Sequence, residues 1–332
     1  MVVIAPNWLG DAVMALPLVA DVHREWPDIH LTVAGRGAVA ALFEMVDEVD
    51  DVLPLKGGGG LAAIASAKAN ARTLAAGEFD AALLLPNSFL SAWMVAQANI
   101  RERWGFRADW RSPLLTRALP RPSKPLHQAA YYQTIASELG LVPGPPYARV
   151  TVSEAGSARA QALLMESGLA PDARFIAMAP GAAYGRAKQW LPERFAQLAT
   201  LVAAERGMRA VLVGAAADAA VCRFIAARAP GTIDLSGKTD LPALAGLLAR
   251  AHAVVANDSG AMHLAAATGT HVVAVFGATN EKRTAPLNAS ASAPPATVVA
   301  SDVWCRPCML RECPIDHRCM TTISARAVLD QI

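Results

Sequence analysis

Short apolar stretches recur along this chain, each followed by a polar loop and then by a segment that favours a helix. The clearest case spans Val254–Thr279: apolar 253–256, polar Asn257–Gly260, helix-favouring 261–267 and apolar 271–276. Apolar runs this short, flanked by turn-forming residues, predict buried strands. The stretch is therefore predicted to form a strand, a polar loop, a helix and a second strand, the repeating unit of a parallel α/β sheet.

The same succession of elements is predicted in both halves of the chain. The expected strands are 2–5, 29–34, 52–55, 81–85, 175–179, 210–213, 233–235, 253–256 and 271–276. The expected helices include 12–26, 62–76, 128–139, 153–167, 241–249 and 261–267. Between the halves, Val142–Pro146 is a Pro- and Gly-rich connection of the kind that joins domains. We therefore predict two α/β domains with parallel sheets, residues 1–150 and 151–332.

Polar residues in the first half follow predicted strands, at the edge of the sheet where open α/β folds bind ligands. Asp11 comes after the first strand, where it can act as a base or cap the next helix. Asn87 and Ser88 come after the strand at 81–85, where they can hydrogen-bond a sugar or only cap a helix. The residues alone leave both choices open.

Two loops in the second half suit a phosphate. Lys188 lies in a glycine-containing loop after a strand, and it either meets a phosphate or is a solvated lysine. Asn257–Gly260 precedes a helix that contains His263, and a helix start offers free N–H groups and partial positive charge to a diphosphate. An ordinary capped helix would have a similar sequence. No Gly-x-Gly-x-x-Gly follows a predicted strand, which argues against a nicotinamide-dependent dehydrogenase.

Composition narrows the classes of function. The 332 residues are 54% apolar and 17% charged, with a net charge of +2, so a large core is easily filled and nucleic acid is not suggested as a partner. No apolar run reaches the ~20 residues of a membrane-spanning helix, and we expect no signal peptide. We expect a soluble, cytoplasmic protein whose contact with a membrane, if it has one, is peripheral. The arginines of 101–111 form either a solvated surface or a patch for an anionic acceptor.

Four cysteines crowd near the C-terminus: Cys305, Cys308, Cys313 and Cys319, with His317 between the last two. In an intracellular protein such a cluster can hold zinc or an iron–sulfur centre. The spacing matches no ferredoxin run, and it favours reduced thiols in a structural loop, or a disulfide formed on oxidation. The fifth cysteine, Cys222, is expected in the core.

Several stretches together resemble the ADP-heptose–lipopolysaccharide heptosyltransferases of bacterial inner-core synthesis, glycosyltransferase family 9. Pro6–Met14 resembles their N-terminal loop, Pro180–Pro192 their central motif, and Asn257–His263 with Phe276–Thr279 their donor motif. The match keeps this order over nearly the whole chain. Leu85–Phe89 and the cysteine-rich tail are more similar to heptosyltransferase II than to heptosyltransferase I.

The resemblance implies a GT-B fold, in which two Rossmann-like domains face each other across a cleft. The N-terminal domain would bind the acceptor and the C-terminal domain the nucleotide sugar. The implied reaction is an inverting transfer of L-glycero-D-manno-heptose from ADP-heptose to the inner-core heptose of lipopolysaccharide. It would need no cofactor and no catalytic metal, and the acceptor would be met on the inner face of the inner membrane.

The resemblance also assigns roles to residues by their place in the motifs. Asp11 would be the catalytic base. The residues that bind the donor would be Lys188, Thr239, Asp258, Ser259, Gly260 and His263. The acceptor-side candidates are Asn87, Ser88 and Arg107. Some relatives carry hydroxyl residues four and five positions before the lysine, where this chain has Tyr184 and Ala183, so backbone N–H groups would replace those contacts with the diphosphate.

Two other interpretations stay open. The first is a related enzyme with another donor or acceptor, such as heptosyltransferase I or III or a nucleotide-sugar epimerase, which donor trials would separate. The second is a non-catalytic module that binds a nucleotide or zinc. A protein that binds ADP but transfers nothing from ADP-heptose would support the second.

Overall fold

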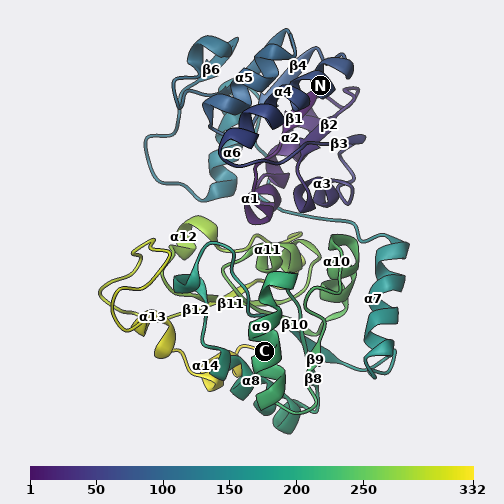
Figure 1. Cartoon of the computed structure of the whole chain (residues 1–332), viewed down its shortest axis with the longest axis vertical. Helices are drawn as coiled ribbons and strands as arrows, with labels where there is room; N and C mark the ends of the chain where they lie inside the picture. Colours follow the sequence, from purple (N-terminus) through teal and green to yellow (C-terminus); the bar gives the residue numbers. More distant parts are fainter. The chain divides into compact units, whose positions relative to one another are not determined.

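The computed structural model describes residues 1–332, except for the side chain of Leu61, and it divides into two compact units, Met1–Pro146 and Tyr147–Ile332 (Figure 1). The division falls at the end of the Pro- and Gly-rich connection, close to the predicted residue 150. Each unit contains a six-stranded parallel sheet with helices on both faces, which confirms the predicted α/β fold class.

The sheet of the first unit has the strand order β3-β2-β1-β4-β5-β6, and all pairs are parallel. Its strands are β1 (Val2–Ile4), β2 (Thr32–Gly35), β3 (Asp51–Pro54), β4 (Ala81–Leu84), β5 (Glu102–Phe106) and β6 (Arg117–Leu119). In register, Val3 lies between Val33 and Leu83. The order reverses between β1 and β4, and the carboxyl ends of strands at such a switch point are where open α/β sheets bind ligands.

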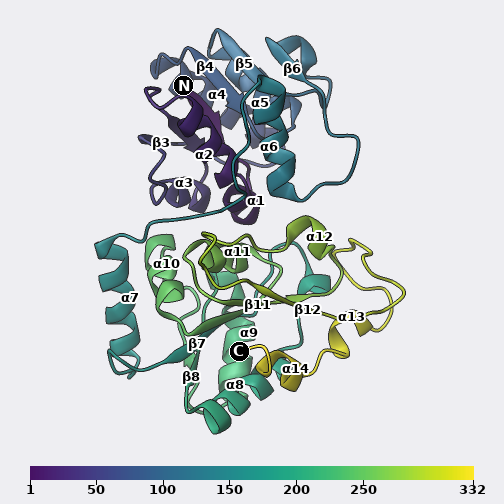
Figure 2. The same ribbon diagram turned by 180° about the vertical axis from the view of Figure 1, so that it is seen from behind.

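Helices cover both faces of this sheet. They are α1 (Leu9–Met14), α2 (Leu16–Glu25), α3 (Ala38–Phe43), α4 (Leu61–Ala76), α5 (Phe89–Gln97) and α6 (Gln128–Leu139), with a 3₁₀ turn η1 (Ser112–Leu114). α4 and α5 pack together over one face, and α2 packs against α6 (Figure 2). The single helix predicted for 12–26 is wrong, because the chain breaks at Ala15 into α1 and α2. Pro17 has no N–H to continue the ladder of α1, which accounts for the break.

The second sheet repeats this arrangement with the order β12-β11-β10-β7-β8-β9. Its strands are β7 (Phe175–Ala179), β8 (Arg209–Leu212), β9 (Ile233–Asp234), β10 (Ala253–Asn257), β11 (Val272–Phe276) and β12 (Thr297–Ala300). All of its pairs are parallel, and the switch point lies between β7 and β10. The two loops predicted to suit a phosphate follow these two strands.

The helices of the second unit also form two layers. They are α7 (Glu154–Glu166), α8 (Pro192–Arg206), α9 (Ala219–Arg228), α10 (Leu241–Arg250), α11 (Gly260–Ala267), α12 (Glu281–Thr284), α13 (Arg318–Thr321) and α14 (Ala325–Leu329), with 3₁₀ turns η2 (Arg186–Lys188) and η3 (Ala216–Asp218). α7 packs against α10, and α8 packs against α9 and α14, as Figures 1 and 2 both show.

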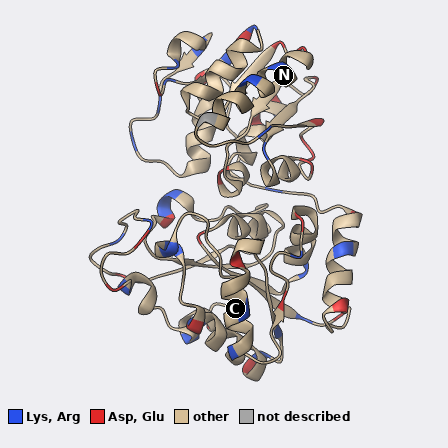
Figure 3. Ribbon diagram, viewed as in Figure 1, with Lys and Arg blue, Asp and Glu red and all other residues tan. Residues whose placement is uncertain are grey.

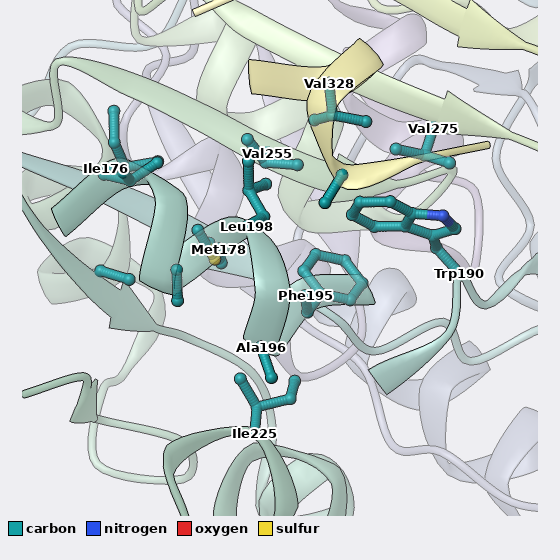
Figure 4. Close-up of a cluster of buried hydrophobic side chains, with 14 of the residues drawn as sticks. Ile176, Met178, Trp190, Phe195, Ala196, Leu198, Ile225, Val255, Val275 and Val328 are labelled. Atoms are coloured by element: carbon teal, nitrogen blue, oxygen red, sulfur yellow. The ribbon is translucent and has the colours of Figure 1, made fainter. Parts of the chain in front are cut away.

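A cluster of buried side chains lies between the sheet of the second unit and α8, α9 and α14 (Figure 4). Trp190 and Phe195 lie edge to face within it, with ring centroids 5.0 Å apart and planes at 69°. Cys222 is fully buried in the same cluster, which confirms its predicted place in the core. Burial raises the pKa of its thiol to about 12.

Three strands were not predicted: β5, β6 and β12, which lie at or next to the outer edges of their sheets.

Lys and Arg are interspersed with Asp and Glu over both units (Figure 3). In the described chain, no helix is long and apolar enough to cross a membrane.

Candidate functional site

The switch point of the second sheet is held together by Asn257, the last residue of β10. Its side chain is fully buried; the amide nitrogen donates to the carbonyl of Pro180 at 2.7 Å, and the amide oxygen accepts from the N–H of Trp190 at 2.9 Å. Asn257 thereby ties both ends of the loop after β7 to the end of β10. The indole of Trp190, buried in the core, donates to the carbonyl of Ile323 at 3.1 Å and anchors the loop from below.

Lys188 lies on this loop and forms an ion pair with Asp258, which follows β10. The ammonium nitrogen is 2.7 Å from the carboxylate Oδ2, and the side chains are only 15% and 5% exposed. The Thr279 hydroxyl donates to the same oxygen at 2.7 Å. Lys188 is therefore not a solvated lysine. The structure brings a desolvated cation and two loops together at the edge of the sheet where a ligand would bind.

The start of α11 lies directly beside this pair. Ser259 occupies the N-cap position with extended backbone, but its side chain does not cap the helix. Its hydroxyl oxygen is buried and makes no hydrogen bond to the described residues. Gly260 is the first residue of α11 and His263 is buried one turn later. The helix start thus presents N–H groups and a partial positive charge next to Lys188, an arrangement that favours an anionic ligand.

Thr239 lies farther along the same edge of the sheet, after β9 rather than at the switch point. It is half-buried and directly precedes Asp240, whose carboxylate caps α10 by accepting from the N–H of Ala243 at 2.9 Å. Lys238 donates to the carbonyl of Asp234 at 2.9 Å. Within the described chain no hydrogen bond joins Thr239 to Lys188 or Asp258, so the structure does not group it with them.

Asp11 lies at the switch point of the first sheet, in the first turn of α1. The cap position of α1 is Trp8, so Asp11 is not the N-cap that the sequence left open. Burial raises the pKa of the Tyr132 hydroxyl on α6, and the negative charge of Asp11 raises it further. The half-buried carboxylate of Asp11 is therefore close to a buried phenol.

Asn87 and Ser88 follow β4, the other strand at this switch point. Ser88 caps α5 by accepting from the N–H of Ser91 at 3.3 Å, and this hydrogen bond uses its oxygen as an acceptor only. Asn87 donates to the hydroxyl of Tyr131 at 2.8 Å and accepts from Arg111 at 3.4 Å. Both ends of its amide are thus oriented by neighbours within the unit.

Arg111 holds the loop after β4 from inside the protein. It is fully buried; it donates to the carbonyl of Phe106 at 2.9 Å, to the hydroxyl of Ser91 at 3.3 Å and to the carbonyl of Pro86. Burial lowers the pKa of the guanidinium to about 10. Buried arginines of this kind are stabilised by the carbonyl groups that they satisfy.

The arginine-rich run is therefore neither a solvated surface nor an anion patch as a whole. Its first part forms β5, where Arg103 donates to the carbonyls of Leu114 and Ile100 at 2.7 and 2.6 Å. Only part of the run stays outside: Arg107 is exposed, and its Nε donates to the carbonyl of Ala118 at 2.8 Å. Arg107 thus keeps its terminal nitrogens available for an anion.

The four C-terminal cysteines are free thiols. Cys308 is exposed, Cys305 and Cys313 are half-buried and Cys319 is buried, and desolvation raises the pKa of Cys319. Among the described side chains, no group of three or more His, Cys, Asp or Glu could hold a metal ion. The segment contacts the site loops instead: Nε2 of His317 donates to the carbonyl of Ala187 at 3.1 Å. Zinc binding by these cysteines stays a prediction.

The sequence did not single out Asn257, Thr279 or Arg111. Asn257 belongs to the polar stretch 257–260, and Thr279 belongs to the stretch 276–279 that resembles the family's donor motif. The sequence predicted no contact for either side chain. Their partners lie far away in sequence, so only the fold pairs them. Arg111 carried a misleading signal, because an arginine in a charged run is usually at the surface.

The two sheets, each with polar loops at its switch point and the second with a desolvated lysine at a helix start, define an α/β enzyme of the GT-B class. Residues 68–318 match the model of glycosyltransferase family 9 (heptosyltransferase). The chain is 30% identical over 302 residues to lipopolysaccharide heptosyltransferase 2 of Salmonella typhimurium, covering 87% of this chain and 85% of the relative. The chain belongs to glycosyltransferase family 9, and it is a glycosyltransferase.

Solved structures agree with this assignment. The chain is similar to the structure of E. coli ADP-heptose lipopolysaccharide heptosyltransferase II, with a TM-score of 0.81, 26% identity and coverage of 99% of this chain and 96% of that one. It is also similar in fold to a family 9 glycosyltransferase from Veillonella parvula, with a TM-score of 0.85 and 20% identity over 99% of this chain and 95% of that one.

Proposed function

We propose that this enzyme transfers L-glycero-D-manno-heptose from ADP-heptose to the inner-core heptose of lipopolysaccharide, the reaction of a heptosyltransferase II. The observation that carries the proposal is the similarity to relatives named heptosyltransferase 2, at 28–30% identity over 87–88% of the chain. A relative named heptosyltransferase 3 is 24% identical over 82% of the chain. The acceptor of the type II enzyme is therefore favoured.

The donor's diphosphate is proposed to bind at the switch point of the second sheet. Lys188 supplies a cation that is already desolvated, and the start of α11 adds N–H groups beside it. The buried hydroxyl of Ser259 supplies a further hydrogen bond when a phosphate oxygen or a sugar hydroxyl reaches it. His263 and Asp258 support this surface from within, and Thr239 is proposed to lie on the adenine side.

Asp11 is proposed to be the catalytic base on the first unit. Its carboxylate would take the proton of the acceptor hydroxyl as that oxygen attacks the anomeric carbon with inversion. The carboxylate lies in the first turn of α1, where the partial positive charge of a helix start favours a negative group. The departing ADP would be stabilised by Lys188 and the start of α11, so the proposal requires no catalytic metal. Asn87, Ser88 and Arg107 are the proposed acceptor-side residues.

Because the proposed acceptor is anchored by lipid A, we propose that the enzyme works at the cytoplasmic face of the inner membrane with peripheral contact. The four cysteines of the C-terminal segment are proposed to have a structural role, with or without zinc. Metal analysis of protein purified without added zinc decides whether the metal is present.

A mass-spectrometric transfer assay tests the proposed function. The purified protein is incubated with ADP-heptose and Kdo2–lipid A that carries no heptose, one heptose or two heptoses. We expect one heptose to be added to the monoheptosylated acceptor only. Addition to the acceptor without heptose would assign a type I activity, and addition to the diheptosylated acceptor a type III activity. UDP-sugars serve as control donors, and transfer from one of them instead would show that the donor is wrong.

A further inference from the structure

The ring of Tyr184 lies close to two cations from different parts of the second unit. The Lys188 ammonium is 4.9 Å from the ring centroid, and the Arg311 guanidinium carbon is 5.1 Å from it. Both distances lie within the ~6 Å over which a cation is attracted to an aromatic face. The Tyr184 hydroxyl donates to the carbonyl of Met309 at 3.0 Å. Tyr184 is therefore hydrogen-bonded to the cysteine-rich segment, residues 305–319.

The backbone of the cysteine-rich segment is held against the lysine loop at Arg311. The N–H of Ala187 donates to the carbonyl of Arg311 at 2.9 Å. Gly185 permits this approach, because a side chain on it would place a Cβ atom 2.9 Å from the Cα atom of Arg311. The ring of His317 donates to Ala187 from the other end of the segment. The position of Arg311 relative to Lys188 is therefore fixed by two hydrogen bonds to the main chain of Ala187, one accepted by the carbonyl of Arg311 and one donated by the ring of His317.

Charge balance distinguishes Arg311 from its neighbours. Asp258 already compensates the charge of Lys188, whereas a diphosphate brings at least two negative charges. Within residues 305–319, Arg306 is paired with Glu281 and Arg318 with Asp316. Arg311 is exposed, and it forms no ion pair with the described residues. It is the arginine of this segment whose charge remains available to a ligand beside Lys188.

We propose that Arg311 makes the second cationic contact to the donor's diphosphate and that the Tyr184 ring orients it together with Lys188. The proposal rests on the donor site proposed above and deepens it. It also gives Tyr184 a part in the site: a ring that holds two cations takes the place of the hydroxyl contact that some relatives make at this point of the loop. A guanidinium suits this task because it binds phosphate oxygens in a bidentate fork while stacking on an aromatic ring.

Calorimetric titration with ADP and with adenosine tests the proposal. The variants are Arg311→Ala and Arg311→Lys, with Arg318→Ala as the matched control from the same segment. Arg311→Ala should weaken ADP binding by about 10-fold or more, the usual effect of losing a charge-assisted contact, and leave adenosine binding unchanged. Arg311→Lys should recover part of the loss, and Arg318→Ala should bind ADP like the wild type. Tyr184→Leu should weaken ADP binding more than Tyr184→Phe, because only leucine removes the ring.

The outcomes separate this inference from the proposed function. If the wild-type protein does not bind ADP, the donor site itself is wrong. If the wild type binds ADP and Arg311→Ala binds it within 2-fold of the wild type, the contact proposed for Arg311 is refuted while the donor site stands. An equal loss in Arg311→Ala and Arg318→Ala would also refute it, because the effect would then come from the general charge of the segment.

Discussion

The ion pair between Lys188 and Asp258 should contribute to the unfolding free energy, and Lys188 should also contribute to ADP affinity. A double-mutant cycle at the two positions measures both contributions. Lys188→Met keeps most of the unbranched apolar stem of the side chain but leaves the Asp258 carboxylate buried without its cation. Breaking a buried pair from one side costs about 3–5 kcal/mol of unfolding free energy. The Thr279 hydroxyl still donates to Asp258, and Lys188 is 15% exposed, so we expect the lower end of that range.

The double variant Lys188→Met/Asp258→Asn removes both charges and keeps an acceptor for Thr279. Its unfolding free energy should recover, giving a coupling energy of about 1–3 kcal/mol between the two positions. ADP binding should not recover, because the phosphate still lacks its cation; we expect a loss of roughly 10- to 100-fold in both variants that lack Lys188. Urea unfolding and ADP titration of the four proteins supply the measurements. A coupling energy below about 0.5 kcal/mol would refute the pair as a stabilising contact.

Three further predictions concern the base, the buried arginine and the thiols. Asp11→Asn should still bind ADP-heptose but turn over about 10²–10⁴-fold more slowly in steady-state kinetics; turnover within a few-fold of the wild type would mean that another residue is the base. Arg111→Met should lower the unfolding free energy by about 3 kcal/mol in urea, because it leaves several buried carbonyls without a donor, and an unchanged midpoint would contradict that role. A thiol reagent at pH 8 should modify Cys308 quickly and Cys222 only after unfolding, because burial keeps Cys222 protonated; modification of both at similar rates would show that Cys222 is accessible.

The sequence predicts the central strands well because they are buried on both faces. β7 and α6 have the predicted bounds, and the other strands near the switch points differ by one to three residues at an end. β5, β6 and β12 were missed since they lie near the outer edges and are only partly buried or short. In β5 and β6, charged residues such as Arg103 and Arg117 interrupt the apolar run that marks a buried strand. β12 has only four residues, Thr297–Ala300, and was not predicted to be a strand.

For the candidate site, the sequence predicted which loops lie together but not the individual side-chain contacts between them. The order of strands and loops was sufficient to predict that the Lys188 and Asp258 loops share an edge of the sheet. It was not sufficient to predict that Thr279 shares an oxygen of Asp258 with Lys188, because that contact depends on how the loop after β11 packs. The burial of Arg111 likewise depends on carbonyls that several separate segments supply.

The cysteine-rich segment is placed so that it supports the donor loops rather than forming a separate module. The N–H of Met309 donates to the carbonyl of Ala278 at 2.9 Å, and Arg306 donates to the carbonyl of Gly277 at 2.8 Å. At its other end, His317 binds the carbonyl beside Lys188. The segment therefore joins the loop after β11 to the loop after β7. A metal or a disulfide formed there would therefore act on the relative position of these two loops, and hence on the ADP affinity proposed for this site.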